Sequence, residues 1–333
     1  MTQSDLQNLI TDVPGFLVGH STCQKARSGV TVLRCERQFI ATADIRGGAP
    51  GTRETDVLDP EKLVGRVDAI VLAGGSVFGL AAGDGVASAL SVDGAGLRLS
   101  DKGPSIPIVP AAVLHDLGND GDKAWGETPP YRNLGVKAVR NASKEFELGA
   151  VGAGTGAMAG VRRGGIGSAS CILQDGVRVG ALVAVNPVGS VYMPDGETFY
   201  AWLWEQNREF GGKPAPTARD QSAPFPPHAR LSALTHERTN TTLAVIATSA
   251  DLTGVETKRV AIMAQDGIAR AIRPAHTPFD GDIVFSVASG ETALPALPRD
   301  RALKTAEIGA AASDCLARAI ARGVYEAERQ TAR

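Results

Sequence analysis

Glycine is the residue that most constrains how this chain can fold. The 333 residues include 39 glycines, many of them in pairs, and glycine interrupts helices and strands and favours tight turns. The apolar segments between the glycines are therefore short. Those rich in β-branched or small apolar residues predict strands at 29–35, 38–45, 68–75, 148–154, 168–173, 177–189, 243–248 and 283–289, and a segment with two prolines predicts an edge or irregular strand at 105–114.

Three helices are predicted among these strands. An Ala-rich segment at 76–91 begins with Ser76, a residue suited to the N-cap position. A second helix opens with a capping box, Thr253 and Glu256, and runs to about Ile272. The last helix has one apolar face, formed by Ile308, Ala312, Cys315, Leu316, Ala319 and Ile320. Because strands and helices follow one another without a βαβ repeat of about 30 residues, the order favours a layered α+β sandwich over a Rossmann fold.

The distribution of charge argues against several classes of partner. Lys and Arg number 34 and Asp and Glu 36, giving a net charge of −2, and no basic cluster that would bind nucleic acid is present. No stretch is suited to a membrane surface, and the longest apolar stretch contains Asp84, so no membrane span is predicted. Residues 1–10 lack the basic and apolar regions of a signal peptide. A cytoplasmic protein is expected.

The cysteines and the glycine-rich runs form no complete motif. Cys23, Cys35, Cys171 and Cys315 are scattered, without CxxC spacing or a nearby histidine, so neither a zinc site nor a disulfide framework is predicted. Each is interpreted as a small apolar core residue. The run GAGTG at 152–156 matches a phosphate-binding loop only in part, because no acidic residue follows a strand at the required distance.

The junction Asn240–Thr241 is the most informative feature for function. A Pro-rich, weakly periodic connection, predicted to be exposed, covers residues 205–240, and a core strand follows at once. One interpretation is structural, because threonine is a common strand residue and asparagine a common loop residue. The other is that cleavage after Asn240 makes Thr241 a new N-terminus. Its α-amino group, with a pKa of about 7.7–8.0, would then take the proton of its own hydroxyl.

Asp280 and Asp282 are a pair of carboxylates with three interpretations, one of which is that they hold the amine of such a nucleophile. Being two residues apart, they face the same side of an extended segment and can hold the Thr241 amine. The alternatives are a turn with solvated acids, or a metal site with His276 as a further ligand. No second histidine or carboxylate cluster lies nearby in the sequence, so no metal is predicted.

Several segments, in this order along the chain, resemble one known family. They are TDVPGFLVGH at 11–20, RGGAPGTRETD at 46–56, AIVLAGGSVFGLAAGDGV at 69–86, GAGTGAMAG at 152–160, VNPVG at 185–189 and NTTLAVIAT at 240–248. Together they resemble the self-cleaving N-terminal-nucleophile hydrolases, which include D-aminopeptidases, β-peptidyl aminopeptidases and 6-aminohexanoate-oligomer (nylon oligomer) hydrolases. The resemblance covers about residues 11–326, and the Asn-Thr junction is closest to the nylon-oligomer branch.

The resemblance implies a single αββα hydrolase domain over residues 1–333, a four-layer sandwich of the N-terminal-nucleophile type. It implies self-cleavage into a large fragment, 1–240, and a small fragment, 241–333. In this family's pattern Thr241 is the nucleophile, Asp280 and Asp282 support it, and Asn186 contributes to the active site as an oxyanion donor. The resemblance also implies a homo-oligomer, often a tetramer, and no cofactor.

Two positions depart from the nylon-oligomer branch. Where that branch has a tyrosine, this chain has His115, for which the first interpretation is a packed histidine. Where that branch has a lysine, this chain offers Val161, Arg162 and Arg163. An arginine stabilises an anion but is not a base at neutral pH. Arg163 is therefore predicted to contact the substrate or the oxyanion, and the same contact is the second interpretation of His115.

The predicted function is a self-processing amide hydrolase that acts on small amides or short peptides, with 6-aminohexanoate oligomers as further substrates. The alternative within this class is an aminopeptidase that releases D- or β-amino acids from short peptides. The alternative from another class is a non-catalytic, ligand-binding member of the fold. The joint presence of Thr241, Asp280, Asp282 and Asn186 argues against that second alternative.

Overall fold

The computed structural model describes residues 6–216, 224–230 and 240–331. Nine strands form one sheet in the order β3-β5-β4-β2-β11-β10-β9-β8, with β1 paired to β2. Their bounds are β1 Phe16–Cys23, β2 Ser28–Ile45, β3 Thr52–Arg53, β4 Arg66–Ala73, β5 Ala111–Val113, β8 Ile166–Ile172, β9 Arg178–Asn186, β10 Thr241–Ala250 and β11 Ile283–Thr292. A separate hairpin joins β6 Met158–Ala159 and β7 Arg162–Arg163, and the helices are α1 Ala81–Val92, α2 Tyr131–Arg140, α3 Gly254–Ala271 and α4 Pro298–Thr331.

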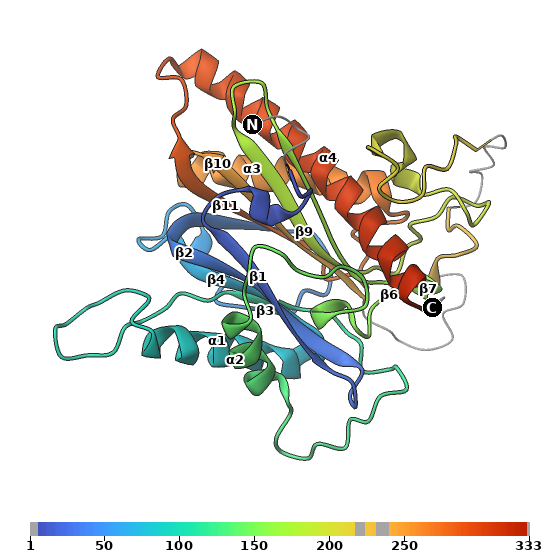
Figure 1. Cartoon of the computed structure of the whole chain (residues 1–333), viewed down its shortest axis with the longest axis horizontal. Helices are drawn as coiled ribbons and strands as arrows, with labels where there is room; N and C mark the ends of the chain where they lie inside the picture. Colours follow the sequence, from blue (N-terminus) through green and yellow to red (C-terminus); the bar gives the residue numbers. More distant parts are fainter. Residues whose placement is uncertain (1–5, 217–223, 231–239, 332–333) are drawn as a thin grey trace.

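Three hydrophobic clusters separate these elements into four layers. The first cluster lies between α3 and α4 and one face of β8–β11. The second lies between the opposite face of those strands and strands β1, β2 and β4. The third lies between β2 and β4 and helices α1 and α2. In Figure 1, α3 and α4 (orange and red) accordingly cover one side of the strands and α1 and α2 (teal and green) the other. The predicted αββα sandwich of the α+β class is confirmed.

Strand β10 lies in the interior of this sandwich. It pairs in parallel with β11 and antiparallel with β9, and every one of its residues is buried. Ala244 and Ile246 face the first cluster, whereas Leu243, Val245 and Ala247 face the second. A strand covered on both faces carries a continuous apolar run, which explains why its sequence is apolar without alternation.

Strand β2 joins the two halves of the sheet. Its 18 residues pair with β1 and β4 near the beginning and with β11 near the end. The prediction of two separate strands at 29–35 and 38–45 is therefore wrong. Glu36 and Arg37 resemble a break in the sequence, but here they are exposed residues of a continuous strand, and the pairing with β4 shifts register between Arg34 and Phe39.

The predictions for the two C-terminal helices are confirmed. Helix α3 begins with the capping box, in which the Thr253 hydroxyl accepts from the Glu256 N–H and the Glu256 carboxylate accepts from the Thr253 N–H, and it ends at Ala271. All six apolar residues predicted for the inner face of the last helix are buried in α4. Short-range periodicity and capping thus predicted both elements.

The N-cap predicted at Ser76 is wrong. Ser76 has a φ of 52° and follows Gly75 at 84°, so the chain turns sharply there. A 3-10 turn, η4 (Ser76–Leu80), comes first, and α1 begins only at Ala81. Ser76 instead lines the cavity described below.

Two predicted strands also differ from the structure. Residues 148–154 are not a strand but include the 3-10 turn η5 (Gly152–Gly154), because Gly149 and Gly152 adopt φ values of 86° and 51° that leave the extended region. The Pro-rich segment 105–114 is irregular, as predicted. The part that joins the large sheet, β5, lies between β3 and β4 rather than at the edge of the sheet.

The predicted connection at 205–240 is described only in part, because residues 217–223 and 231–239 lie outside the described residues. In the remainder, Phe210 packs in the first hydrophobic cluster and Ala229 is buried. The segment therefore contributes to the packing beside β10.

Candidate active site

The site is built where β10 begins, between the end of β9 and the beginning of β11. Thr241 is the first residue of β10, and it lies opposite Asn186, the last residue of β9. Asn240 makes a parallel bridge to Asp280, just before β11. The topology thus brings together four of the predicted residues, which are separated by up to 94 positions in the sequence (186 to 280). Thr241 is only 3% exposed.

Asn240, on the acyl side of the junction, is held by hydrogen bonds through both its N–H and its carbonyl oxygen. The Asn240 N–H donates to the Phe279 carbonyl oxygen at 2.9 Å, and the Asn240 carbonyl oxygen accepts from the Gly281 N–H at 2.8 Å. The Thr241 hydroxyl donates to the same carbonyl oxygen at 2.5 Å. The hydroxyl oxygen therefore lies beside the one carbonyl group that it would have to attack, and an N–H is already directed at the oxygen on which negative charge would develop.

Asp282 fixes the position of β10 against the loop before β11. Its Oδ1 accepts from the Thr242 N–H at 2.7 Å. Its Oδ2 accepts from the His276 N–H at 3.0 Å and lies 2.9 Å from His276 Nδ1. His276 has a φ of 56°, a left-handed conformation that is uncommon outside glycine. The carboxylate therefore joins the residue after Thr241 to the turn of the loop.

Asp280 is completely buried and is bound by three donors. Its Oδ1 accepts from the Val188 N–H at 3.0 Å, and its Oδ2 accepts from the Thr277 N–H at 3.1 Å and the Thr277 hydroxyl at 2.6 Å. Burial, and to a lesser extent the negative charge of Asp282, raises the pKa of Asp280 to about 6. Desolvation destabilises the charged form of a carboxyl group, so Asp280 takes up a proton at much higher pH than a solvated aspartate.

Asn186 connects β9 to the walls of the site. Its Oδ1 accepts from the Met158 N–H at 2.9 Å, and its Nδ2 donates to the His115 carbonyl oxygen at 3.3 Å. These two contacts fix the orientation of the Asn186 side-chain amide, and Asn186 itself pairs with Thr241 in the ladder. His115 contributes its backbone to this contact and is half-buried.

Two cavities have His115 as a common lining residue, and one of them is also lined by Thr241. One, of about 290 Å³, is lined by Thr241 and His115 and by apolar groups, Ala49, Pro50, Val77, Leu80 and Val113 among them. The other, of about 450 Å³, is lined mainly by polar and charged groups, including His115, Asp116, Arg163, Asn186 and Arg230. His115 lines both. Of the three residues considered in place of the branch's lysine, Arg163 lines the polar cavity, whereas Arg162 pairs with Glu328 and stacks on Tyr192.

Three neighbours of the site carried no signal in the sequence. Arg230 donates to the side chain of Asn240, yet it stands in a Pro-rich segment without periodicity. Gly281 lies between the two aspartates and Thr277 lies three residues before the first of them, and no sequence pattern distinguishes either residue. Their importance depends on the pairing of Asn240 with Asp280, which brings distant parts of the chain together.

Several alternative sites receive no support from the described residues. The amides of Gly152 and Ala153 in the glycine-rich run donate to the hydroxyls of Thr22 and Thr31 and are therefore not free to bind a phosphate. Within the described part of the chain, no three His, Cys, Asp or Glu side chains gather as a metal site would require, and no helix is long and apolar enough to cross a bilayer.

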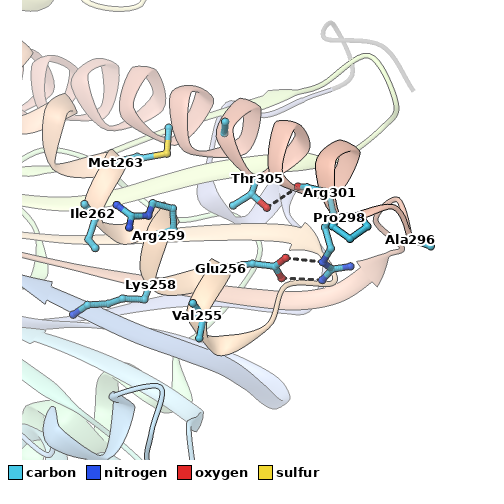
Figure 2. Close-up of a pocket in the computed structure, with 12 residues that line it drawn as sticks. Val255, Glu256, Lys258, Arg259, Ile262, Met263, Ala296, Pro298, Arg301 and Thr305 are labelled. Carbon is cyan, nitrogen blue, oxygen red and sulfur yellow. Dashed lines mark hydrogen bonds and ion pairs between the residues drawn. The ribbon is translucent and has the colours of Figure 1, made fainter.

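A larger cavity, of about 590 Å³, lies between α3 and α4, as Figure 2 shows. It is lined by the first turns of both helices, and Arg301 forms an ion pair with Glu256 at its rim. Because α3 follows the end of β10 and Thr241 is at the beginning, a strand of 10 residues, about 30 Å long, separates this cavity from the site.

Comparison with known proteins places the chain in a family. A model of peptidase family S58 matches residues 8–333. An uncharacterized aminopeptidase of Mycobacterium tuberculosis is 44% identical over 96% of this chain and 94% of that protein. A 6-aminohexanoate-oligomer endohydrolase of Paenarthrobacter ureafaciens is 30% identical over 92% of this chain and 82% of that protein. The crystal structure of the L-aminopeptidase D-Ala-esterase/amidase of Ochrobactrum anthropi, an N-terminal-nucleophile (Ntn) hydrolase fold, matches with a TM-score of 0.70 at 22% identity, over 96% of this chain and 86% of that one.

Taken with the four-layer fold, these similarities define a peptide or amide hydrolase with the N-terminal-nucleophile hydrolase architecture. The chain belongs to peptidase family S58. The family resemblance predicted from its sequence motifs is confirmed, including the relationship to the nylon oligomer hydrolases.

Proposed function

We propose that the chain cleaves its own Asn240–Thr241 bond and then uses Thr241 as the N-terminal nucleophile of an amide hydrolase. The Thr241 hydroxyl oxygen attacks the Asn240 carbonyl carbon, the hydroxyl proton passes to the Thr241 nitrogen, and the carbon–nitrogen bond breaks. An ester then joins Asn240 to the Thr241 oxygen. Water hydrolyses this ester, leaving a carboxylate on Asn240 and a free amine and hydroxyl on Thr241.

The observation that carries this proposal is the geometry at the Asn240 carbonyl group. The oxygen accepts from both the Thr241 hydroxyl and the Gly281 N–H. A pre-aligned N–H donor stabilises the developing negative charge by about 2.7–4 kcal/mol. The nucleophile and the oxyanion donor therefore lie on the same carbonyl group before any reaction takes place.

In turnover, the free Thr241 amine accepts the proton of its own hydroxyl, whose oxygen attacks the substrate amide. The amine product leaves with that proton, and water hydrolyses the acyl-enzyme. Asp282 holds the backbone next to the nucleophile, and we assign the retention of the Thr241 amine to Asp280 and Asp282 together. Asn186, opposite Thr241 in the ladder, is proposed as an oxyanion donor. His115 and Arg163 line the cavities and are proposed to contact the substrate.

The proposed substrates are small amides and short peptides. Two cavities of about 290 and 450 Å³ suit a molecule of a few residues and not a folded protein. Relatives named as an aminopeptidase and as a 6-aminohexanoate-oligomer endohydrolase indicate two substrate groups to test: the p-nitroanilides of L-, D- and β-amino acids, and linear 6-aminohexanoate oligomers.

The decisive experiment is an intact mass spectrum of the purified protein under denaturing conditions, beside the Thr241→Ala and Thr241→Ser variants. We expect two species, residues 1–240 and 241–333, from the wild type and from Thr241→Ser, which keeps a hydroxyl, and one uncut chain from Thr241→Ala. An uncut wild-type chain would reject the proposal. Hydrolysis of the test substrates by the wild type and not by Thr241→Ala then assigns turnover to the same hydroxyl.

A homo-oligomer, specifically a tetramer, is also part of the proposal, by family resemblance. Light scattering coupled to size-exclusion chromatography measures the mass of the particle directly. Four times the mass of one chain, 34.5 kDa, is the expected value, and a mass equal to one chain would contradict it.

A further inference from the structure

The side chain of Asn240 is held as firmly as its backbone. Asn240 is fully buried, and its Oδ1 accepts from Arg230 Nη1 at 2.5 Å. Its N–H is bound to Phe279 and its carbonyl oxygen to Gly281. The residue on the acyl side of the junction is therefore fixed through its side chain, its amide nitrogen and its carbonyl group.

Arg230 is itself anchored to the loop that follows η5 and forms β6. Its Nε donates to the Gly160 carbonyl oxygen at 2.7 Å and its Nη2 to the Met158 carbonyl oxygen at 2.5 Å. Its backbone N–H donates to the Val188 carbonyl oxygen at 2.9 Å. A planar guanidinium with its donors in fixed directions can satisfy Met158, Gly160 and Asn240 only in one orientation, so it presents a rigid donor to the Asn240 side chain.

We infer that Arg230 is a positioning residue for self-cleavage, which acts by holding the Asn240 side chain so that the Asn240 carbonyl group stays against the Thr241 hydroxyl. This inference rests on the proposed function. A rotation of residue 240 about its backbone would move the side chain and the carbonyl group together, so fixing the first restrains the second. A displacement of the reacting atoms by about 1 Å can slow a reaction by about 100-fold.

Two other roles for Arg230 have to be separated from this one. The guanidinium could serve only to hold β6 through Met158 and Gly160, in which case its loss would weaken the fold regardless of residue 240. Its positive charge could also assist the reaction at a distance, in which case the identity of residue 240 would again not matter. Only a positioning role through the side chain makes the effects of Arg230 and Asn240 depend on each other.

A double-mutant cycle tests this dependence. Wild type, Arg230→Met, Asn240→Ala and the double variant are made by cell-free synthesis, and the appearance of the 241–333 fragment is followed over time on denaturing gels. We expect each single variant to slow self-cleavage by about 10- to 100-fold, and the double variant to be no slower than the slower single variant, because both changes remove the same contact.

The outcomes are distinct from those that test the proposed function. An uncut wild-type chain rejects self-cleavage altogether. A wild type that cuts itself while Arg230→Met cuts at the same rate overturns the positioning role, and so does a double variant whose slowing is the product of the two single effects. To monitor folding, each Arg230 substitution is also combined with Thr241→Ala, which prevents cleavage, and the melting temperature of the uncut chain is measured. If Arg230→Met lowers the melting temperature by more than about 5 °C, the same cycle and criteria apply to Arg230→Lys, which keeps the charge.

Discussion

Gly281 leaves the space in which the Thr241 hydroxyl lies. A Cβ on Gly281 would come within 2.8 Å of Thr241 Oγ1 and within 2.8 Å of the Ala49 carbonyl oxygen, which is closer than packed atoms tolerate. We predict that Gly281→Ala slows self-cleavage by about 100-fold or more, because it displaces the nucleophile and the N–H donor together. The rate of fragment appearance measures this effect.

Gly254→Ala is the matched control for that substitution. Gly254 is the first residue of α3, and a Cβ there would meet only Pro60, at 3.9 Å, an ordinary contact. This variant should cleave itself at the wild-type rate. If Gly281→Ala cut as fast as Gly254→Ala, the close packing at the junction would have no part in the reaction.

The buried Asp280 predicts a specific dependence of stability on pH. Its pKa is raised to about 6, whereas an unfolded aspartate titrates near about 3.9. Between these values the folded chain holds a proton that the unfolded chain has released, so the free energy of unfolding falls as pH rises from about 4 to about 6. Below about pH 4 the folded and the unfolded chain both hold the proton, so Asp280 no longer lowers the free energy of unfolding.

Removing the charge of Asp280 should remove this part of the pH dependence. In the uncleavable Thr241→Ala chain, we expect Asp280→Asn to gain stability relative to its parent as pH rises through the window, by at most about 3 kcal/mol. Urea unfolding at several pH values between 4 and 7 measures the difference. Parallel stability curves for the two chains would mean that the pKa of Asp280 is not raised by folding.

Single residues of the site differ in how far the sequence could predict them. Thr241, Asp280, Asp282 and Asn186 stand in local patterns that resemble a family, and the structure places them around one junction. Arg230 stands in no pattern. Its contact with Asn240, ten positions further along the chain, depends on the contacts that hold its guanidinium against Met158 and Gly160, and such long-range contacts leave no local trace in the sequence.

At the scale of elements, α4 lies unusually close to β8 because the facing residues are glycines. A Cβ on Gly167 would overlap the backbone carbonyl of Ala319, and Gly165 and Gly323 approach each other in the same crossing. We predict that Gly167→Ala lowers the free energy of unfolding of the Thr241→Ala chain by about 1–3 kcal/mol, because the helix has to move away from the sheet. Urea unfolding beside Gly254→Ala, which should change stability by less than about 0.5 kcal/mol, provides the test.

The sequence could predict the elements that depend on residues close together in the chain, but not those that depend on tertiary pairing. The capping box at Thr253 and the apolar face of α4 depend on residues three or four positions apart, and both are confirmed. Strand β2 and the turn at Ser76 depend on tertiary pairing. The exposed Glu36–Arg37 pair lies where the pairing of β2 with β4 shifts register.

At the scale of the whole molecule, the strand order interleaves the two proposed fragments. Strands β10 and β11, from 241–333, lie between β2 and β9, from 1–240, and α3 and α4 pack on strands of both. We predict that the cut protein elutes as one particle containing both fragments in equal amounts, and that they separate only in denaturant, because separation would tear open the sheet and two hydrophobic clusters. Size-exclusion chromatography with denaturing gels of each fraction measures this, and separate elution of a native fragment would contradict it.

The layered architecture was predictable, whereas the continuity of its sheet was not. Short apolar segments, frequent glycines and the absence of a βαβ repeat favour a sandwich. That the two halves of the sheet are joined through 18 residues of β2 depends on how β4 and β11 share that strand, which is a property of the assembled fold.

The burial of the Asn240–Thr241 junction has a consequence for the life of the protein in a cell. The junction is enclosed by groups from both sides of the cut, Arg230 on one and Phe279 and Gly281 on the other, and these meet only after the sheet has formed. Under the proposed mechanism, a misassembled chain does not cleave itself. The amide hydrolase therefore becomes active only after the sheet has formed. The proportion of cut chain in a lysate becomes an internal record of folding success, readable without any added reporter.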